Sequence, residues 1–177
     1  MRPPAGLAVA PFPPFNDGVS GGRTEESLLE NAFVSVRRAL SGFGLVRVVR
    51  SDVAIDALEQ VDVAWGSVNR VLVSLDKTKH TLLIDMRLAR GRNDDAFEQR
   101  VAPHRAATVH GFARVAVLVK SLPGQLQVQR HVREDGLGVV QIFISEEAAL
   151  EWLANPSQPP PRSAPSSAPS RRPGPKS

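Results

Sequence analysis

The chain has 177 residues, of which 42% are hydrophobic and 23% charged, and these are the length and composition of a protein with one folded domain. It contains no cysteine, which excludes disulfides, thiolate metal sites and a cysteine nucleophile and fits a reducing cytoplasm. The net charge of +4 lies in residues 155–177, whereas residues 1–154 hold 18 basic and 18 acidic residues and so lack the overall basic charge of a nucleic-acid-binding domain.

Residues 1–30 are predicted to be disordered or loosely packed. They are rich in proline and glycine and show no sustained period of 2 or 3.6 residues. Residues 7–10 form their only uninterrupted apolar run, which is too short for a signal-peptide core. No apolar run in the chain approaches the roughly 20 residues that span a membrane. We therefore expect a cytoplasmic protein with no membrane span.

Two strands are predicted next, over residues 33–36 and 45–50. The segment Ser41-Gly42-Phe43-Gly44 between them supplies glycines that accept a positive φ, so the two strands are expected to form a hairpin. Arginines alternate with valines in the second strand, which indicates a sheet edge with one solvated face.

An amphipathic helix of about six turns is predicted after a cap at Ser51 or Asp52. Its apolar positions follow one another at spacings of three or four residues. They are Ile55, Leu58, Val61, Trp65, Val68, Leu72 and Leu75. Trp65 is expected to be a core residue rather than a stacking platform for a base.

The apolar run from Thr81 to Met86 predicts a central strand that is buried on both faces. Three arginines follow it, and then Asn93 is predicted to cap a helix whose first turn carries Asp94 and Asp95, which suit the helix dipole. Ligands of open α/β sheets bind beyond the carboxyl ends of strands, so a binding site is expected here. Its predicted residues are Arg87, Arg90, Arg92, Asn93 and Asp94.

The rest of the chain alternates helices and strands. A helix runs from residue 94 to Gly111 and either restarts or kinks at Pro103. A buried strand is predicted over residues 113–119 and is followed by a helix that Ser121 caps. A last strand over residues 139–144 precedes a helix from Ser145 to residue 154. Residues 155–177 are rich in proline, serine and arginine and are predicted to be a disordered basic tail.

This order of elements predicts an α/β fold with a single mixed, largely parallel sheet of about five strands and helices packed on it. The predicted domain covers residues 31–154, between the N-terminal segment 1–30 and the tail 155–177.

The sequence contains no catalytic or metal-binding motif. No serine has the Gly-x-Ser-x-Gly setting of a nucleophile, and the glycine-rich loops that hold phosphates are absent. His104 and His110 are six residues apart, which is about 240° around a helix, so they share no face and are expected at the surface. We therefore expect no enzymatic activity, no metal site and no cofactor.

The arginines after the central strand leave two interpretations open. Arg87, Arg90 and Arg92 could bind a phosphate or carboxylate through charge-assisted hydrogen bonds. Alternatively, they could pair with acidic neighbours in a solvated loop. A second charged patch, over residues 130–135, is expected to be solvated.

The element order and three segments resemble the STAS domain family, in particular the bacterial anti-sigma-factor-antagonist-like branch that is grouped with lipid-transfer, CRAL-TRIO-like domains. The segments are LLIDMR at residues 82–87, ARVAVLV at 113–119 and VVQIFISEEAALEWLA at 139–154. The resemblance covers residues 31–154. It implies a small, non-enzymatic regulatory module that binds proteins or nucleotides.

Phospho-switched members of that family carry an Asp-Ser pair where the helix after the central strand begins. Here the corresponding residues are Arg92-Asn93-Asp94-Asp95, which have no hydroxyl group. A phosphorylation switch is therefore not expected in this chain.

Two functions follow from the resemblance. The first is a protein-interaction module of a bacterial signalling system that docks through the loop and helix after the central strand. The second is a carrier of the lipid-transfer type that binds a small lipid or anion between a helix and the sheet. Nucleic acid is expected to bind only weakly, through the basic tail.

Overall fold

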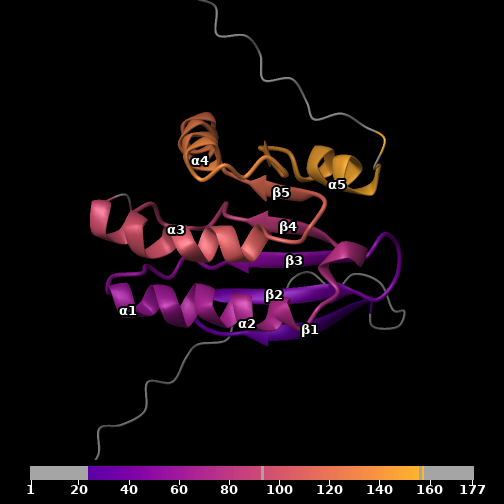
Figure 1. The fold of residues 1–177 in the computed structure, drawn as a ribbon, viewed down its shortest axis with the longest axis horizontal. Helices are drawn as coiled ribbons and strands as arrows, with labels where there is room; N and C mark the ends of the chain where they lie inside the picture. Colours follow the sequence, from indigo (N-terminus) through magenta and orange to yellow (C-terminus); the bar gives the residue numbers. More distant parts are fainter. Residues whose placement is uncertain (1–23, 93, 156, 158–177) are drawn as a thin grey trace, which may run out of the picture.

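The computed structural model describes residues 24–92, 94–155 and 157. In this part of the chain six strands form one mixed sheet in the order β1-β2-β3-β4-β5-β6 (Figure 1). The strands are β1 (Glu25–Glu30), β2 (Val34–Ala39), β3 (Leu45–Arg50), β4 (Thr81–Asp85), β5 (Val115–Leu118) and β6 (Val140–Phe143). The first three pair antiparallel, and β3 to β6 pair parallel. The predicted α/β fold and the hairpin are confirmed.

The sheet has one more strand than predicted, because β1 precedes the predicted domain start at residue 31. β1 pairs with β2 from Glu25 opposite Ala39 to Glu30 opposite Ser35. Its two leucines are consecutive, which hides the period of two that marks a strand. A register shift between Ser27 and Leu29 accommodates them, and both leucines pack against the core. The predicted disorder of residues 1–23 lies outside the described residues.

The helices connect the parallel strands and follow β6. They are α1 (Leu58–Val61), the π-helical turn η1 (Asp62–Gly66), α2 (Ser67–Val73), the short 3₁₀ turn η2 (Lys77–Lys79), α3 (Asp95–Val109), α4 (Leu122–Glu134) and α5 (Glu146–Ala154). Ser121 and Ser145 cap α4 and α5 as predicted, since each side-chain oxygen accepts from the N–H three residues on. α3 continues through Pro103 without a restart. None of the described helices is long and apolar enough to cross a membrane.

The long predicted helix begins later than expected. Ser51 does not cap it, because its side-chain oxygen accepts from the N–H of Val53, before the helix begins, while its hydroxyl donates to the carbonyl of Ala32. The helix starts at Leu58. The N–H groups of Asp56 and Ala57, just before it, donate to the side-chain oxygen of Gln60 in its first turn. α1, η1 and α2 then run on without a break and place Val61, Trp65, Val68 and Leu72 in the core, as the spacing predicted.

The two faces of the sheet carry separate hydrophobic cores. On one face, residues such as Val48, Leu82 and Val117 pack against α1–α2 and α3. On the other face, Leu83, Leu118 and Phe143 pack against α5. Because side chains alternate across a strand, β4 contributes to both cores and is buried along most of its length. The central strand is therefore where it was predicted.

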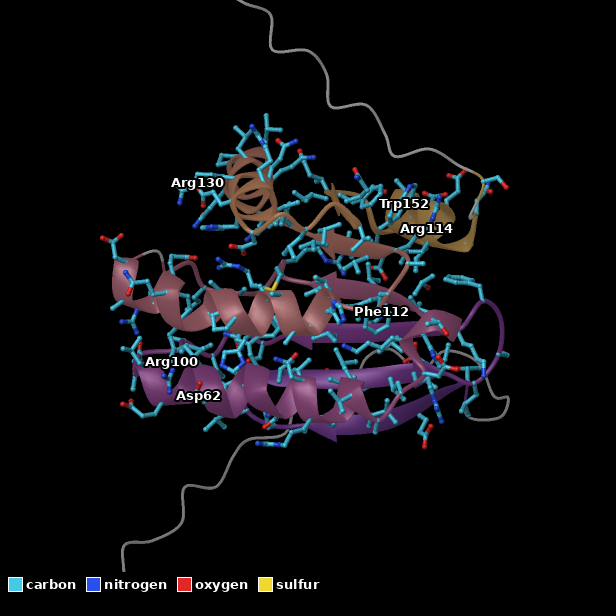
Figure 2. All side chains as sticks on the ribbon, in the orientation of Figure 1. Asp62, Arg100, Phe112, Arg114, Arg130 and Trp152 are labelled. Atoms are coloured by element: carbon cyan, nitrogen blue, oxygen red, sulfur yellow. The ribbon has the colours of Figure 1, made fainter. Side chains whose placement is uncertain are left out.

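Polar contacts also join α1–η1 to α3 on the first face. Figure 2 shows Asp62 of η1 and Arg100 of α3, which form an ion pair. His104 of α3 lies 2.9 Å from the same carboxylate and is half-buried, which corrects its predicted surface position. Asp62 thus contacts side chains from two consecutive turns of α3.

Candidate functional site

A cavity of about 420 Å³ lies between the sheet and helices α3 and α4. Its inner walls are apolar and come from η1, β4, β5 and both helices. The side chains that define these walls are Trp65, Ile84, Val101, Val117, Val128 and Val132. Figure 1 shows α3 and α4 beside the strands β4 and β5. The cavity therefore lies between the sheet and its covering helices, where a closely packed domain would have side chains.

The small side chains of α4 explain why this layer contains a cavity. Gly124, Val128 and Val132 are spaced at four residues, so they share one face of α4, and all three line the cavity. Val101 and Val109 of α3 line the same cavity. A glycine and two valines on this face of α4 fill less of the space between the two helices than larger side chains would.

Basic side chains line this cavity, most of them near the carboxyl edge of the parallel strands. Six arginines and lysines line it, whereas Glu98 is its one acidic lining residue among the described residues. The basic residues are Arg50, Arg87, Arg90, Arg92, Arg105 and Lys120. An apolar interior with a basic edge suits a ligand that has an apolar body.

The structure brings most of the predicted binding residues to this cavity. Arg87, Arg90 and Arg92 all line it. Asp94 caps α3 by accepting from the N–H of Phe97 at 3.1 Å. Asn93 was predicted to be the cap and lies outside the described residues. Whether these residues bind a ligand remains a prediction.

Arg92 is held by intramolecular contacts. Its guanidinium pairs with Asp94 at 2.5 Å, which is one of the acidic neighbours proposed from the sequence. It also donates to the carbonyls of Ile55 and Asp56, and it lies 5.2 Å from the centre of the Phe97 ring. Arg92 thereby ties the start of α3 to the segment before α1, and its charge is already neutralised.

Arg87 is also neutralised, by Asp85 two residues before it and by Glu146, which is far away in the sequence. It contacts the buried carboxylate of Asp85 at 2.5 Å and Glu146 of α5 at 2.7 Å. Glu146 contacts Arg47 of β3 as well, at 2.7 Å. This cluster fastens α5 to the second face of the sheet, so Arg87 has a structural role there.

Acid should weaken the attachment of α5. Burial alone would raise the pKa of Glu146, but hydrogen bonds and charges from Arg47 and Arg87 outweigh it and hold the pKa below its ordinary value. A lowered pKa stabilises the fold above the unfolded-state pKa, about 4.3, and this contribution is lost as the pH falls through the folded-state pKa.

We expect Glu146→Gln to cost about 1 kcal/mol of unfolding free energy at pH 7. The difference between the wild type and the variant should be smaller at pH 3 than at pH 7, which urea denaturation at both pH values would measure. Glu147→Gln, at the exposed neighbouring position, is the matched control and should have little effect. An equal loss for Glu146→Gln at both pH values would contradict the ionic role of Glu146.

Arg50 is a lining residue that the sequence did not reveal. It was predicted on a solvated face, yet it is only 3% exposed. It shares the core face of β3 with Val46 and Val48, and this period of two was the signal that could have found it. Its guanidinium donates to the carbonyls of Phe33 and Val53, and no carboxylate in the described part of the chain contacts it.

Burial makes the positive charge of Arg50 less favourable. Removal from water lowers the pKa of its guanidinium from the ordinary value. A buried positive charge without a counter-ion is unfavourable, and backbone carbonyls compensate it only in part. An anion in the cavity would supply the missing counter-charge.

Arg105 forms the charged wall between α3 and α4. It contacts Glu98 at 2.7 Å and Asp135 at 2.8 Å. Burial alone would lower the pKa of Arg105, but these two carboxylates raise it. The buried ring of His131 lies 3.6 Å from Glu98. The predicted solvated patch at residues 130–135 thus contributes Asp135 and His131 to the junction of the two helices.

Comparisons with known proteins give one likeness. No family model and no curated protein matches the chain. The chain is similar to a solved structure of an uncharacterised protein from the DUF3478 family, with a SpoIIAA-like fold, from Shewanella loihica PV-4. The two are 14% identical with a TM-score of 0.49, and the match covers 77% of this chain and 99% of the other. The likeness is one of fold.

The SpoIIAA-like fold named for that neighbour is the STAS-like fold that the sequence resembles. At this identity and TM-score the likeness says nothing about a ligand or a partner. The function of this chain therefore rests on its own residues.

Proposed function

We propose that this protein is a non-catalytic binding protein that holds one small ligand in the cavity between the sheet, α3 and α4. The cavity itself carries the proposal. Its volume of about 420 Å³ lies within the range of small-molecule sites, and its inner walls are formed by aliphatic side chains and Trp65. Filling it would remove apolar surface from water on both the ligand and the walls.

The volume limits the size of the ligand. At about 30 Å³ per water in the liquid, 420 Å³ corresponds to roughly 14 water molecules. A compound with about a dozen non-hydrogen atoms would fit this space. One short alkyl chain has this size, whereas a phospholipid with two long chains does not. This is the small-ligand function that was the second interpretation of the sequence.

Trp65 provides a direct test, because it lines the cavity while Trp152 lies in the other core. In a Trp152→Phe variant, the fluorescence of Trp65 should change saturably on titration with 1-decanol, a neutral apolar probe. Trp65→Phe with Trp152 retained is the control, and it should show no saturable change. If Trp152→Phe does not fold, the difference between wild type and Trp65→Phe isolates the same signal. Titrations of decanol and decanoate that both leave Trp65 unchanged would contradict the proposed function.

A second candidate function is docking of a protein, and exposed leucines favour it. Leu88 in the loop after β4 and Leu122 and Leu126 of α4 are 59%, 61% and 59% exposed. Leu122 and Leu126 are one turn apart, so they share a face of the helix. Together with the nearby cations Arg90 and Lys120 they suit an acidic, amphipathic segment of another protein. The regulatory and signalling role expected from the STAS resemblance belongs to this candidate.

This candidate predicts that one defined partner is lost when the leucines are replaced. Leu88→Ser combined with Leu122→Ser should abolish its recovery in a pulldown under native conditions. Val73→Ser is the matched control, because Val73 of α2 is 77% exposed and lies on a different element. Equal recovery of the partner by the wild type, the double leucine variant and Val73→Ser would count against docking at these leucines.

A further inference from the structure

We propose that the ligand is a single-chain amphipathic anion whose charged head group lies against Arg50, Arg90 and Lys120 while its apolar chain fills the cavity. A medium-chain fatty acid represents this class. This inference deepens the proposed function, because it rests on the same cavity and adds the charge and orientation of the ligand.

Only some of the positive charges around the cavity are paired with carboxylates of the chain. Arg87, Arg92 and Arg105 each contact one or two carboxylates of the chain. The other three basic lining residues contact none among the described residues. They are Arg50, Arg90 and Lys120. The described part of the site thus retains three positive charges without an intramolecular counter-charge, which favours an anionic ligand over a neutral or cationic one.

Arg90 and Lys120 lie in adjacent loops at one end of the cavity. Arg90 follows β4 and Lys120 follows β5, and these neighbouring strands are parallel. The first residue after β4 is bonded to the last residue of β5, because the N–H of Met86 donates to the carbonyl of Leu118 at 2.9 Å. Both cations are exposed and both line the cavity. A head group at this edge could therefore remain close to water while it contacts them.

Arg50 approaches the same end from inside. It is the last residue of β3, which is the other parallel neighbour of β4, so all three cations belong to the carboxyl edge of the sheet and line the same cavity. Unlike Arg90 and Lys120, Arg50 is buried, and its hydrogen bonds go to carbonyls only. A carboxylate at this position would gain charge-assisted hydrogen bonds in a partly desolvated setting.

The walls restrict the rest of the ligand. Beyond the three cations, Ile84, Val117 and Val128 present hydrocarbon to the cavity. A second charge or a row of hydroxyl groups would lose its hydration there without gaining partners. A simple inorganic anion would leave the apolar space unfilled. An anionic head followed by one hydrocarbon chain satisfies both parts of the site, and decanoate has the dozen non-hydrogen atoms that the volume allows.

The test compares decanoate with 1-decanol, which share the chain and differ in the head group. Both are titrated as monomers at pH 7.5 into the full-length Trp152→Phe variant, with Trp65 fluorescence as the signal. Decanoate should bind about tenfold or more tightly than decanol. In Arg90→Gln/Lys120→Gln this preference should fall several-fold, because only Arg50 remains to attract the head group, while decanol affinity should stay unchanged. Inorganic phosphate at the same concentrations should cause no saturable change.

Arg70→Gln/Arg130→Gln is the matched control, because it removes the same charge from residues that do not line the cavity. Arg70 lies on α2, and Figure 2 shows Arg130 on α4. This variant should retain the preference for decanoate. Equal affinities of the unmodified cavity for decanoate and decanol would overturn the anion inference and leave the binding function standing. An equal loss of the preference for decanoate in both double variants would also overturn it, because only the net charge of the protein would then matter. If neither compound binds, the proposed function itself fails.

Discussion

Replacing Leu82 with alanine is expected to lower the free energy of unfolding by about 2–5 kcal/mol. Leu82 lies on the central strand β4, is fully buried, and packs in the core beneath α1–α2 and α3. The substitution removes most of a buried side chain and leaves a void that the surrounding sheet and helices cannot close. Urea denaturation followed by far-UV circular dichroism would measure the loss.

Ile84→Ala, two residues further along the same face of β4, provides the informative comparison. Ile84 was expected from the sequence to be an ordinary core residue, but its side chain also lines the cavity. Some of its packing partners are already missing on that side, so its truncation should cost about 2 kcal/mol, at the low end of the range. A greater loss for Ile84→Ala than for Leu82→Ala would show that the space beside Ile84 is filled.

Replacing Val117 with phenylalanine is expected to weaken decanoate binding on the order of a hundredfold. Val117 of β5 faces the cavity, and the larger side chain adds four non-hydrogen atoms there. Displacing about four methylenes of the ligand at ~0.8 kcal/mol each removes about 3 kcal/mol of binding free energy. The same substitution should change the stability of the ligand-free protein by less than 1 kcal/mol, because the ring enters existing space.

Leu118→Phe is the matched control for this substitution. Leu118 is the next residue of β5 and points into the closely packed core under α5. An extra ring there has no free space, so the variant should lose about 1–3 kcal/mol of stability while it still binds decanoate. Two variants with the same loss of stability would contradict the presence of a cavity on the Val117 side.

Local sequence patterns predicted the strands and helix starts that depend only on residues close by in the sequence. The run from Thr81 to Met86 predicted the central strand, because an uninterrupted apolar segment needs burial on both faces. Ser121 and Ser145 predicted the starts of two helices, because a cap depends only on N–H groups within the next turn. These features require no knowledge of the rest of the chain.

The elements that were missed depend on partners far away in the sequence. β1 is a strand because β2 offers it an edge, although its own pattern is weak. Ser51 was expected to cap a helix, but its hydroxyl donates to the distant carbonyl of Ala32 and its oxygen accepts from Val53 in the segment before the helix. The helix begins at Leu58. Competition of this kind between local and tertiary hydrogen bonds leaves no trace in a short window of sequence.

The sequence predicted where the candidate site lies but not which residues form it or which of its arginines are already paired. The arginines after β4 line the cavity, as the rule for carboxyl ends of strands suggested. The sequence could not show which of these arginines are paired with acids. Arg87 contacts Glu146 of a distant helix, whereas Arg90 contacts no acid in the described residues. The cavity itself arises from the small residues Gly124 and Val128 on α4, whose effect depends on what lies opposite them.

Crystal structures of the chain alone and with decanoate would test the central claim most directly. We predict an open space between Val117 and Val128 in the first structure and the alkyl chain of decanoate in that space in the second. The carboxylate should lie within hydrogen-bonding distance of Arg90 or Lys120. A ligand-free structure in which side chains fill this space, or decanoate bound at another place on the molecule, would contradict the proposed binding function.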